Sequence, residues 1–331
     1  MSQTPAKATI YDVAERAGVS ISTVSLAVNT PHRVRAETRE RIVAAAAALG
    51  YRMTSDGRSG VSRIAVAAPY TSYPTYLRRL AGMLRRARSA AVDLVPYDLD
   101  SAASATAPLL ESLPARADVA GLIMMGVPLG GAALRASRAA RLPLAFVDIV
   151  RPARSGASSV LVDDLAGGRM LGAHLRELGH RRVAFVHEVQ RSQGYVSAGM
   201  LRADGMAEQL QLLPVASAGP DSVETDALRS AAAKGVTAFV ANHDRLAAAV
   251  LKAVSGSPEL AAMTVTGYDD GELAEALQLT TVRQPFEETG RVALESVLER
   301  IADPSRGASR TVLEPTLVVR ASSRPASARL A

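Results

Sequence analysis

The chain of 331 residues contains no cysteine and no tryptophan, and only 4% of its residues are aromatic. Without cysteine it can form no disulfide framework, no thiol nucleophile and no cysteine-ligated metal site. The N-terminal stretch MSQTPAKAT lacks the apolar core of a secretory signal. The longest uncharged run, from Val119 to Leu134, contains glycines and a proline and is too short to span a bilayer. We therefore expect a soluble, cytoplasmic protein that has no membrane partner.

The sequence motifs of common catalytic sites are also missing. The pair His187-Glu188 has no second histidine of a zinc-protease motif, and the run GVPLGG lacks the lysine of a phosphate-binding loop. No serine occupies a nucleophile elbow. The adjacent aspartates at 163–164 and 269–270 diverge along the chain, so neither pair is placed to share a proton. We therefore expect no enzyme, no cofactor and no bound metal.

Positive charge is concentrated in the first 63 residues of the chain. These residues carry nine Lys or Arg and five Asp or Glu, which gives +4 of the total net charge of +6. A small basic segment attached to a nearly neutral body suggests that the segment binds a polyanion. Arginine-rich codon usage is an alternative explanation for this charge.

The stretch TIYDVAERAGVSISTVSLAVN, near the N-terminus, has the pattern of two short helices joined by a tight turn. Thr9 and Asp12 can form a capping box at the start of the first helix. Gly18 supplies the left-handed residue that ends this helix, and Ser20 can cap the second one. With a third helix at 36–51, the pattern predicts a helix-turn-helix whose second helix enters the major groove. A three-helix bundle without a ligand is the alternative.

This stretch, continued by VRAETRERI and LGY, resembles the DNA-binding head of the lactose/galactose repressor (LacI/GalR) family of bacterial transcription regulators. The resemblance implies that Ile21, Ser22 and Leu26 contact bases of double-stranded operator DNA. The positions that it matches to contacts with phosphate or the nearby groove, which fix the register on the duplex, are Tyr11, Ser20, Thr23, Ser25, Asn29 and Thr38. We expect a homodimer, because a two-fold operator requires paired heads.

From Arg63 onward, apolar strands alternate with helices, which predicts doubly wound parallel sheets covered on both faces. In the first half we expect strands at 63–69, 93–99, 119–126 and 142–150, with helices at 73–92 and 103–113 and another helix after the third strand. In the second half we expect strands at 158–164, 181–188, 236–244 and 263–270, with helices at 165–180, 201–212 and 245–256. Two similar halves suggest two lobes that bind a ligand between them, beyond the carboxyl ends of the strands.

This body resembles the effector-binding core of the same family, which has the periplasmic-binding-protein type I fold. The segments that carry the resemblance are VDDLAGGRMLGAHLRELGHRRVAFV, TAFVANHDRLA, VTGYDD and LTTVRQPFEETG. The family implies three crossings between the lobes, which we place near 161–163, 284–287 and 313–316. The expected domains are a helix-turn-helix domain at 1–52, a linker or degenerate hinge at 53–62, an N-terminal lobe at 63–161 and 287–313, a C-terminal lobe at 162–286 and 314–323, and a tail at 324–331.

The resemblance also implies a small polar effector, such as a sugar, bound between the two lobes. The positions that it matches to effector contacts are Asp148, Arg202, His243, Asp269 and Phe286. The loop after the first strand adds Tyr70, Tyr73 and Tyr76. Carboxylates accept hydrogen bonds from paired hydroxyls, and arginine donates in a planar fork, so these residues suit a polar ligand. Because tryptophan is absent, a nucleoside or a polyol stays an alternative to a sugar.

Several of these assignments have structural alternatives. Asp269 can cap a turn, Arg202 can pair with a nearby acid, and His243 can be a turn residue at a strand end. The function also has an alternative, which is a cytoplasmic binding protein for sugars or other small molecules with a vestigial DNA-binding head. Binding to DNA from upstream of the chain's own gene distinguishes the two functions.

The linker RMTSDGRSGVS departs from the family pattern. It lacks the leucine that the family inserts into the minor groove, and its aspartate, serines and glycines are poor helix formers. Either Met53 or Val61 acts as a weaker apolar wedge between base steps, or the linker stays flexible and the operator is bent little. A second departure is Arg35, which replaces the serine that normally caps the third helix.

The third departure is Leu26, which stands where the family usually has arginine. Arginine grips guanine through two hydrogen bonds, whereas leucine offers only apolar contact, as to a thymine methyl group. We predict an operator half-site that depends little on a guanine beside Leu26, and selection of binding sites from random duplexes measures this preference. A strong guanine requirement that disappears in Leu26→Ala contradicts the prediction.

Overall fold

The structure is a computed structural model, and it describes residues 8–51, 62–90, 92–99, 112–116, 118–149, 156–189, 196–217, 219 and 221–326. Most of the helix expected at 103–113 lies outside these ranges, as do Met53 and Val61 of the expected hinge. The side chain of Asn29 is likewise outside the described part. The chain forms two compact units, which contain Met1–Leu161 with Phe286–Thr311 (unit 1) and Val162–Pro285 with Val312–Ala331 (unit 2).

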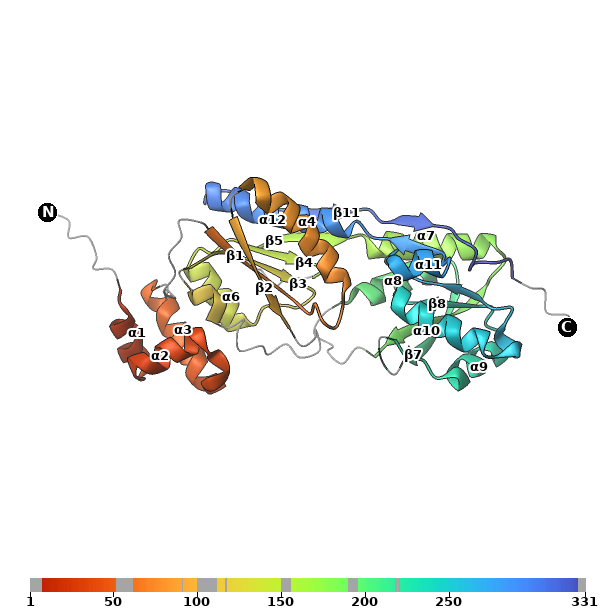
Figure 1. Cartoon of the computed structure of the whole chain (residues 1–331), viewed down its shortest axis with the longest axis horizontal. Coiled ribbons are helices and arrows are strands. Elements are labelled where there is room, and N and C mark those ends of the chain that lie inside the picture. The colour runs from red at the N-terminus through yellow and green to blue at the C-terminus, as the bar shows by residue number, and fades with distance from the viewer. Residues whose placement is uncertain are drawn as a thin grey trace. The chain divides into compact units, whose positions relative to one another are not determined.

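The N-terminal head of unit 1 is a small helical bundle (Figure 1). Its elements are α1 (Ile10–Ala17), α2 (Ile21–Asn29), the short 3-10 helix η1 (Pro31–Arg33) and α3 (Ala36–Leu49). The bundle buries one apolar residue or more from each long helix, including Val13, Val24 and Ile42. This arrangement confirms the predicted helix-turn-helix.

Local capping explains where the first two helices begin and end. The Thr9 amide donates to the Asp12 carboxylate at 2.7 Å, and the Thr9 hydroxyl accepts from the Asp12 amide, so the capping box is formed. Gly18 ends α1 with a left-handed φ of 63°, a conformation that costs glycine little. Ser20 then caps α2 by accepting from the Thr23 amide at 3.1 Å.

The α/β part of unit 1 is built on one sheet with the strand order β11-β5-β4-β3-β1-β2. Its strands are β1 (Ser62–Ala68), β2 (Val92–Asp98), β3 (Val119–Met125), β4 (Leu144–Val147), β5 (Ser158–Val162) and β11 (Arg310–Leu313). Strands β1 to β5 pair in parallel, which confirms the predicted fold class. Pro96 lies within β2, where its missing N–H is tolerated because β2 is an edge strand that pairs only with β1.

Helices cover the sheet of unit 1. They are α4 (Thr75–Ala90), the 3-10 helix η2 (Leu113–Ala115), α6 (Gly131–Ala139) and α12 (Phe286–Ala302). Alternate sheet residues such as Ala65 and Leu122 share one buried cluster with Ala133 of α6. Helices α4 and α12 pack against each other (Figure 1).

The α4–α12 contact is made at backbone distance. A Cβ atom added to Gly82 would lie 1.9 Å from the carbonyl oxygen of Glu287, and one added to Gly290 would lie 1.9 Å from the carbonyl oxygen of Arg79. Real Cβ atoms do not approach backbone so closely, so both glycines are required for this crossing.

Unit 2 has a parallel sheet with the order β7-β6-β8-β9 and an antiparallel pair, β10-β12. The strands are β6 (Arg182–Glu188), β7 (Gln211–Ser217), β8 (Ala238–Ala241), β9 (Thr264–Thr266), β10 (Thr281–Arg283) and β12 (Thr316–Val318). The helices are α7 (Asp164–Glu177), α8 (Ala198–Ala207), α9 (Thr225–Ala233), α10 (Asp244–Ser255), the 3-10 helix η3 (Pro258–Leu260) and α11 (Glu272–Ala276). One sheet face packs on α9 and α10 and the other on α7 and α8.

The predicted helix at 201–212 is wrong in its second half. Helix α8 ends at Ala207, and Gln211 begins β7, whose seven residues all pair with β6. The apolar run around Leu212 has no decisive period, but Pro214 within it disfavours a helix interior. Like Pro96 in unit 1, Pro214 is tolerated because β7 is an edge strand.

We predict that Gly82→Ala destabilises unit 1. The added Cβ atom forces α4 and α12 apart, and overpacking of this kind costs about 1–3 kcal/mol of unfolding free energy. Gly307→Ala is the matched control, because a Cβ atom there meets nothing within 4 Å, and we expect a change below about 0.5 kcal/mol. Urea unfolding of both variants measures the difference, and equal midpoints would contradict the predicted close packing.

Candidate functional site

The head exposes one side of α2 to solvent. Ile21 and Leu26 are 39% and 37% exposed, and Ser22 and Ser25 are exposed beside them. Val24 and Ala27, which alternate with these residues, are buried in the head core. The second helix therefore presents two apolar side chains and two hydroxyls on a free surface.

Hydroxyl groups gather at the N-terminus of α2. The Ser20 hydroxyl lies 2.8 Å from that of Ser22 and 2.7 Å from that of Thr23. The N-terminus of a helix carries a partial positive charge, so this cluster suits a contact with phosphate. Tyr11 on α1 is 67% exposed, and Thr38 on α3 is half-buried.

Arg39 fixes the turn before α3 and was missed by sequence reasoning. Arg35 occupies the N-cap position of α3 but forms no side-chain cap, as the loss of the family's serine predicted. The buried guanidinium of Arg39 instead donates to the backbone carbonyls of Pro31 and Val34. An arginine in the first turn of a helix gives no sequence signal for such a role.

In unit 1, Arg79 gathers three of the predicted effector residues at the carboxyl edge of the sheet. Its guanidinium forms an ion pair with Asp148, which follows β4 in a left-handed conformation with a φ of 59°. The same guanidinium lies 4.3 Å from the ring centroid of Phe286 and 5.0 Å from that of Tyr76. Arg79 itself is only 3% exposed and was not predicted.

The other tyrosines of this edge differ in accessibility. The rings of Tyr73 and Tyr76 meet edge to face with centroids 6.5 Å apart, and both residues are half-buried. Tyr70 is buried, and its hydroxyl donates to the Val66 carbonyl of β1 at 3.3 Å. Burial raises the pKa of Tyr70, and the nearby carboxylate of Asp98 adds to the shift.

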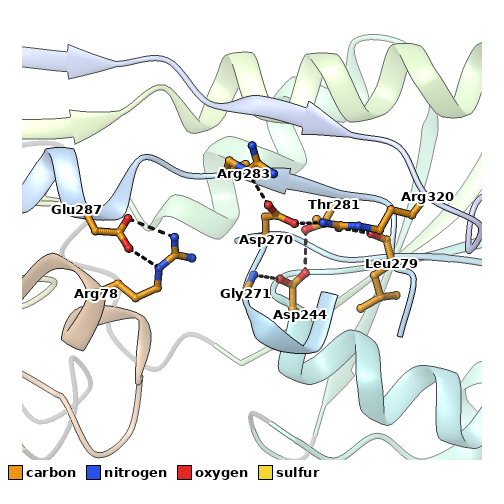
Figure 2. A network of polar contacts seen from close by, with 9 residues as sticks. All are labelled: Arg78, Asp244, Asp270, Gly271, Leu279, Thr281, Arg283, Glu287 and Arg320. Atoms are coloured by element: carbon orange, nitrogen blue, oxygen red, sulfur yellow. Dashed lines mark hydrogen bonds and ion pairs between the residues drawn. The ribbon is translucent and has the colours of Figure 1, made fainter. Parts of the chain in front are cut away.

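Arg78 is also tied to α12. It forms a two-pronged ion pair with Glu287, with N···O distances of 3.0 and 3.2 Å (Figure 2). Its guanidinium lies 5.1 Å from the ring centroid of Phe286, which is only 1% exposed. Arginine side chains of unit 1 thus cover the ring of Phe286, which was predicted to contact the effector.

In unit 2, Arg202 is the centre of a second buried cluster. Its Nε donates to Asp164 at 2.8 Å, and its Nη1 donates to the backbone carbonyl of Asn242 at 2.6 Å. Its guanidinium lies 3.8 Å from the ring centroid of Tyr268. Burial opposes the charge of Arg202, but Asp164, Tyr268 and Asp269 together outweigh it and raise the arginine pKa.

His243 caps helix α10 with its ring. Its Nδ1 accepts from the Leu246 amide at 3.2 Å, which assigns the proton to Nε2. That Nε2 then donates to the Glu188 carboxylate at 3.2 Å. Burial disfavours ionised Glu188, but hydrogen bonds from His243 and from the Asn242 side chain outweigh it and lower the pKa of Glu188.

The aspartates after β9 have separate partners. Asp269 accepts a hydrogen bond from the side-chain amide of Gln284 at 2.6 Å. Asp270 forms ion pairs with Arg283 and Arg320 at 2.6 and 2.7 Å (Figure 2). Asp244 accepts from the Gly271 amide and the Thr281 hydroxyl, both at 2.8 Å (Figure 2).

Among the buried carboxyl groups of this region with a shifted pKa, Asp244 is the one whose ionised form is most disfavoured. Burial, together with the negative charge of Asp269, raises its pKa to about 7. Its hydrogen bonds to Gly271 and Thr281 act in the opposite direction. Asp244 follows β8 beside His243, at a strand end where a ligand is expected, but it was not among the predicted effector contacts.

The predicted effector residues lie in two kinds of segment. Five follow strands, namely Tyr70, Tyr73, Asp148, His243 and Asp269, and three lie on helices, namely Tyr76 on α4, Arg202 on α8 and Phe286 on α12. Tyr76, Asp148 and Phe286 meet around Arg79, whereas Tyr70 turns toward β1. In unit 2, Arg202 donates to the backbone carbonyl of Asn242, the residue directly before His243. Asp269 lies near Arg202. The residues that sequence reasoning missed are the internal partners Arg79, Asp164, Glu188, Asn242 and Gln284.

Within the described ranges, no helix is long and apolar enough to cross a membrane. The same part of the chain contains no group of three or more His, Asp or Glu side chains arranged to hold a metal ion.

Two family models match the chain. The model described as "Bacterial regulatory proteins, lacI family" matches residues 9–53, which contain the helix-turn-helix. The model described as "Periplasmic binding protein-like domain" matches residues 173–323, most of which belong to unit 2.

Named relatives and solved structures match over nearly the whole chain. The HTH-type transcriptional regulator DegA of Bacillus subtilis is 27% identical, over 96% of this chain and 99% of that protein. The structure of the transcriptional regulator CelR in complex with cellobiose is 25% identical, with a TM-score of 0.68, over 96% of this chain and 100% of that one. The lac repressor dimer bound to operator and the anti-inducer ONPF is 25% identical, with a TM-score of 0.63, over 96% and 99%. The head therefore matches the lacI family of bacterial regulatory proteins, and the chain is similar to regulators of that family over nearly its whole length.

Proposed function

We propose that this protein is a sequence-specific DNA-binding transcription regulator, and in particular a repressor, that acts in the cytoplasm under the control of a small polar effector. The observation that carries the proposal is the exposed side of α2 in a helix-turn-helix whose first two helices are capped by Thr9 and Ser20, in a chain whose α/β units carry polar clusters at their carboxyl sheet edges. A free second helix of this kind is the element that enters the major groove.

Base contacts are proposed for Ile21, Ser22 and Leu26. The two apolar side chains can contact thymine methyl groups, and the serine hydroxyl can donate to or accept from a base edge. The phosphate contacts are proposed for the hydroxyl cluster of α2 and its neighbours, namely Tyr11, Ser20, Thr23, Ser25, Asn29 and Thr38. Such contacts fix the register of the head and make its affinity depend on salt.

The effector is proposed to be an uncharged polar molecule such as a sugar. The relative CelR was solved with cellobiose, which supports this class of ligand. The effector contacts are proposed to come from Tyr73, Tyr76, Asp148, Arg202, His243, Asp269 and Phe286. Tyr70 is a weaker candidate, because its hydroxyl is used by the β1 backbone. No catalytic role is proposed for these residues.

A homodimer is proposed because a near-palindromic operator requires two heads. Helix α4 exposes Leu77 and Leu84 at 52% and 48%, one helical repeat of seven residues apart. Leu84 also lines a surface groove together with Ala87 and Val92. The lac repressor was solved as a dimer on its operator, which supports the same assembly for this chain.

The proposed function predicts a sequence-dependent mobility shift with DNA from upstream of the chain's own gene. In Ser25→Asp, the new negative charge on the free side of α2 repels phosphate, and we expect binding weakened by at least about tenfold. Ser230→Asp is the control, because Ser230 is equally exposed but lies on α9 of unit 2. Equal shifts by the wild type on upstream and unrelated duplexes would favour a small-molecule binding protein with a vestigial head.

A further inference from the structure

A five-residue pattern occurs once in each unit, on the helix that follows the first strand of a strand–helix–strand repeat. Arg79 to Met83 reads RLAGM on α4, after β1, and Arg202 to Met206 reads RADGM on α8, after β6. In both units this first strand pairs with an edge strand that carries a proline. The two segments therefore hold equivalent places in an internal repeat.

The packing around the two patterns is also equivalent. The glycine of each pattern approaches a backbone carbonyl of the partner helix, so that a Cβ atom on Gly82 would lie 1.9 Å from the Glu287 oxygen and one on Gly205 would lie 2.2 Å from the Leu165 oxygen. Three residues after each of those carbonyls, Gly290 and Gly168 approach the carbonyl of the pattern's own arginine in return, at 1.9 and 2.2 Å by the same measure. These reciprocal contacts fix both arginine backbones in the same way.

The two arginine side chains have matching surroundings. Arg79 and Arg202 are 3% and 7% exposed, and each guanidinium lies against an aromatic ring and beside a carboxylate. An aspartate follows the equivalent strand in each unit, Asp148 after β4 and Asp269 after β9, and both are left-handed. The amides of both aspartates donate to the strand beyond, to the carbonyls of Val160 and Val282.

One substitution breaks this equivalence. In unit 2, Asp164 stands four residues before Gly168 and accepts from the Nε of Arg202 at 2.8 Å. In unit 1, the residue four before Gly290 is Phe286, which offers a ring and no acceptor. As a result, the buried Nε of Arg79 has no hydrogen-bond partner among the described residues. A buried donor without an acceptor is rare and costly in a folded protein.

We propose that Arg79 is a specificity-determining residue of the effector site, the counterpart in unit 1 of Arg202, and that its Nε donates to a hydroxyl or carbonyl oxygen of an uncharged polyhydroxylated effector. The inference rests on the proposed effector function. An uncharged oxygen fits because Asp148 already neutralises the guanidinium, so a carboxylate or phosphate gains no net charge there. The half-buried ring of Tyr76 covers the more accessible side of the guanidinium, whereas the ring of Phe286 is fully buried.

The test is a thermal-shift and titration panel on the full-length protein. The probes are D-ribose, D-glucose, D-galactose, cellobiose, D-mannitol and adenosine, and a probe that binds raises the melting temperature by mass action. Arg79→Lys keeps a cation beside Asp148 but removes the Nε donor, and Arg79→Met removes all donors. For any probe that binds the wild type, we expect affinity to fall by about tenfold in both variants.

The control variant is Arg86→Met, which removes the ion pair of Arg86 on α4 with Glu295 on α12. We expect this change to leave probe affinity within about twofold. Monodeoxy analogues of the probe that binds distinguish a structural role of Arg79 from its direct contact with the effector. One analogue should lose affinity for the wild type and lose none for Arg79→Lys, because the same hydrogen bond is already absent.

The outcomes are distinct. If a probe binds the wild type and Arg79→Lys equally, or if every deoxy analogue loses affinity for both proteins alike, Arg79 does not contact the effector and the inference is wrong. If no probe stabilises the wild type, the effector half of the proposed function is contradicted and this inference fails with it. The DNA-binding half is then still judged by the mobility shift.

Discussion

Each α/β unit depends on two helices that cross at backbone distance. The crossing is possible because each helix offers a glycine to a carbonyl of the other, Gly82 with Gly290 in unit 1 and Gly168 with Gly205 in unit 2. The close approach leaves little freedom to the residues around it. It therefore fixes the backbones of Arg79 and Arg202, whose side chains organise the polar clusters at the carboxyl edges of the sheets.

The two clusters use charge in a way that suits an uncharged ligand. The guanidinium groups of Arg79 and Arg202 are each paired with a carboxylate, so neither cluster holds an isolated buried cation, which would be very unfavourable. What remains for a ligand is directional hydrogen bonding and contact with rings. The head works differently, because its hydroxyls and apolar tips on α2 lie exposed at the surface, where the proposed function has them meet a polyanion in water.

Local features of the head could be predicted from the sequence, whereas the ion pairs of the α/β units could not. The capping box at Thr9, the left-handed Gly18 and the cap at Ser20 each depend on neighbours within four residues, so the pattern alone was sufficient. The alternation of strands and helices gave the fold class. The pairing of Arg79 with Asp148 joins residues far apart in the chain, and no period or motif connects them. The start of β7 was missed for a similar reason, because only its pairing with β6 identifies the segment as a strand.

The most direct measurement is the affinity of the full-length protein for its selected operator and for a shuffled duplex, by fluorescence anisotropy at one fixed salt concentration. We expect the operator to bind roughly a thousandfold more tightly than the shuffled duplex. A sugar that stabilises the protein should change this ratio, since a ligand that favours one conformation shifts the population of the other. Equal affinity for both duplexes, with or without the sugar, would contradict the account of this chain as a ligand-controlled DNA-binding regulator.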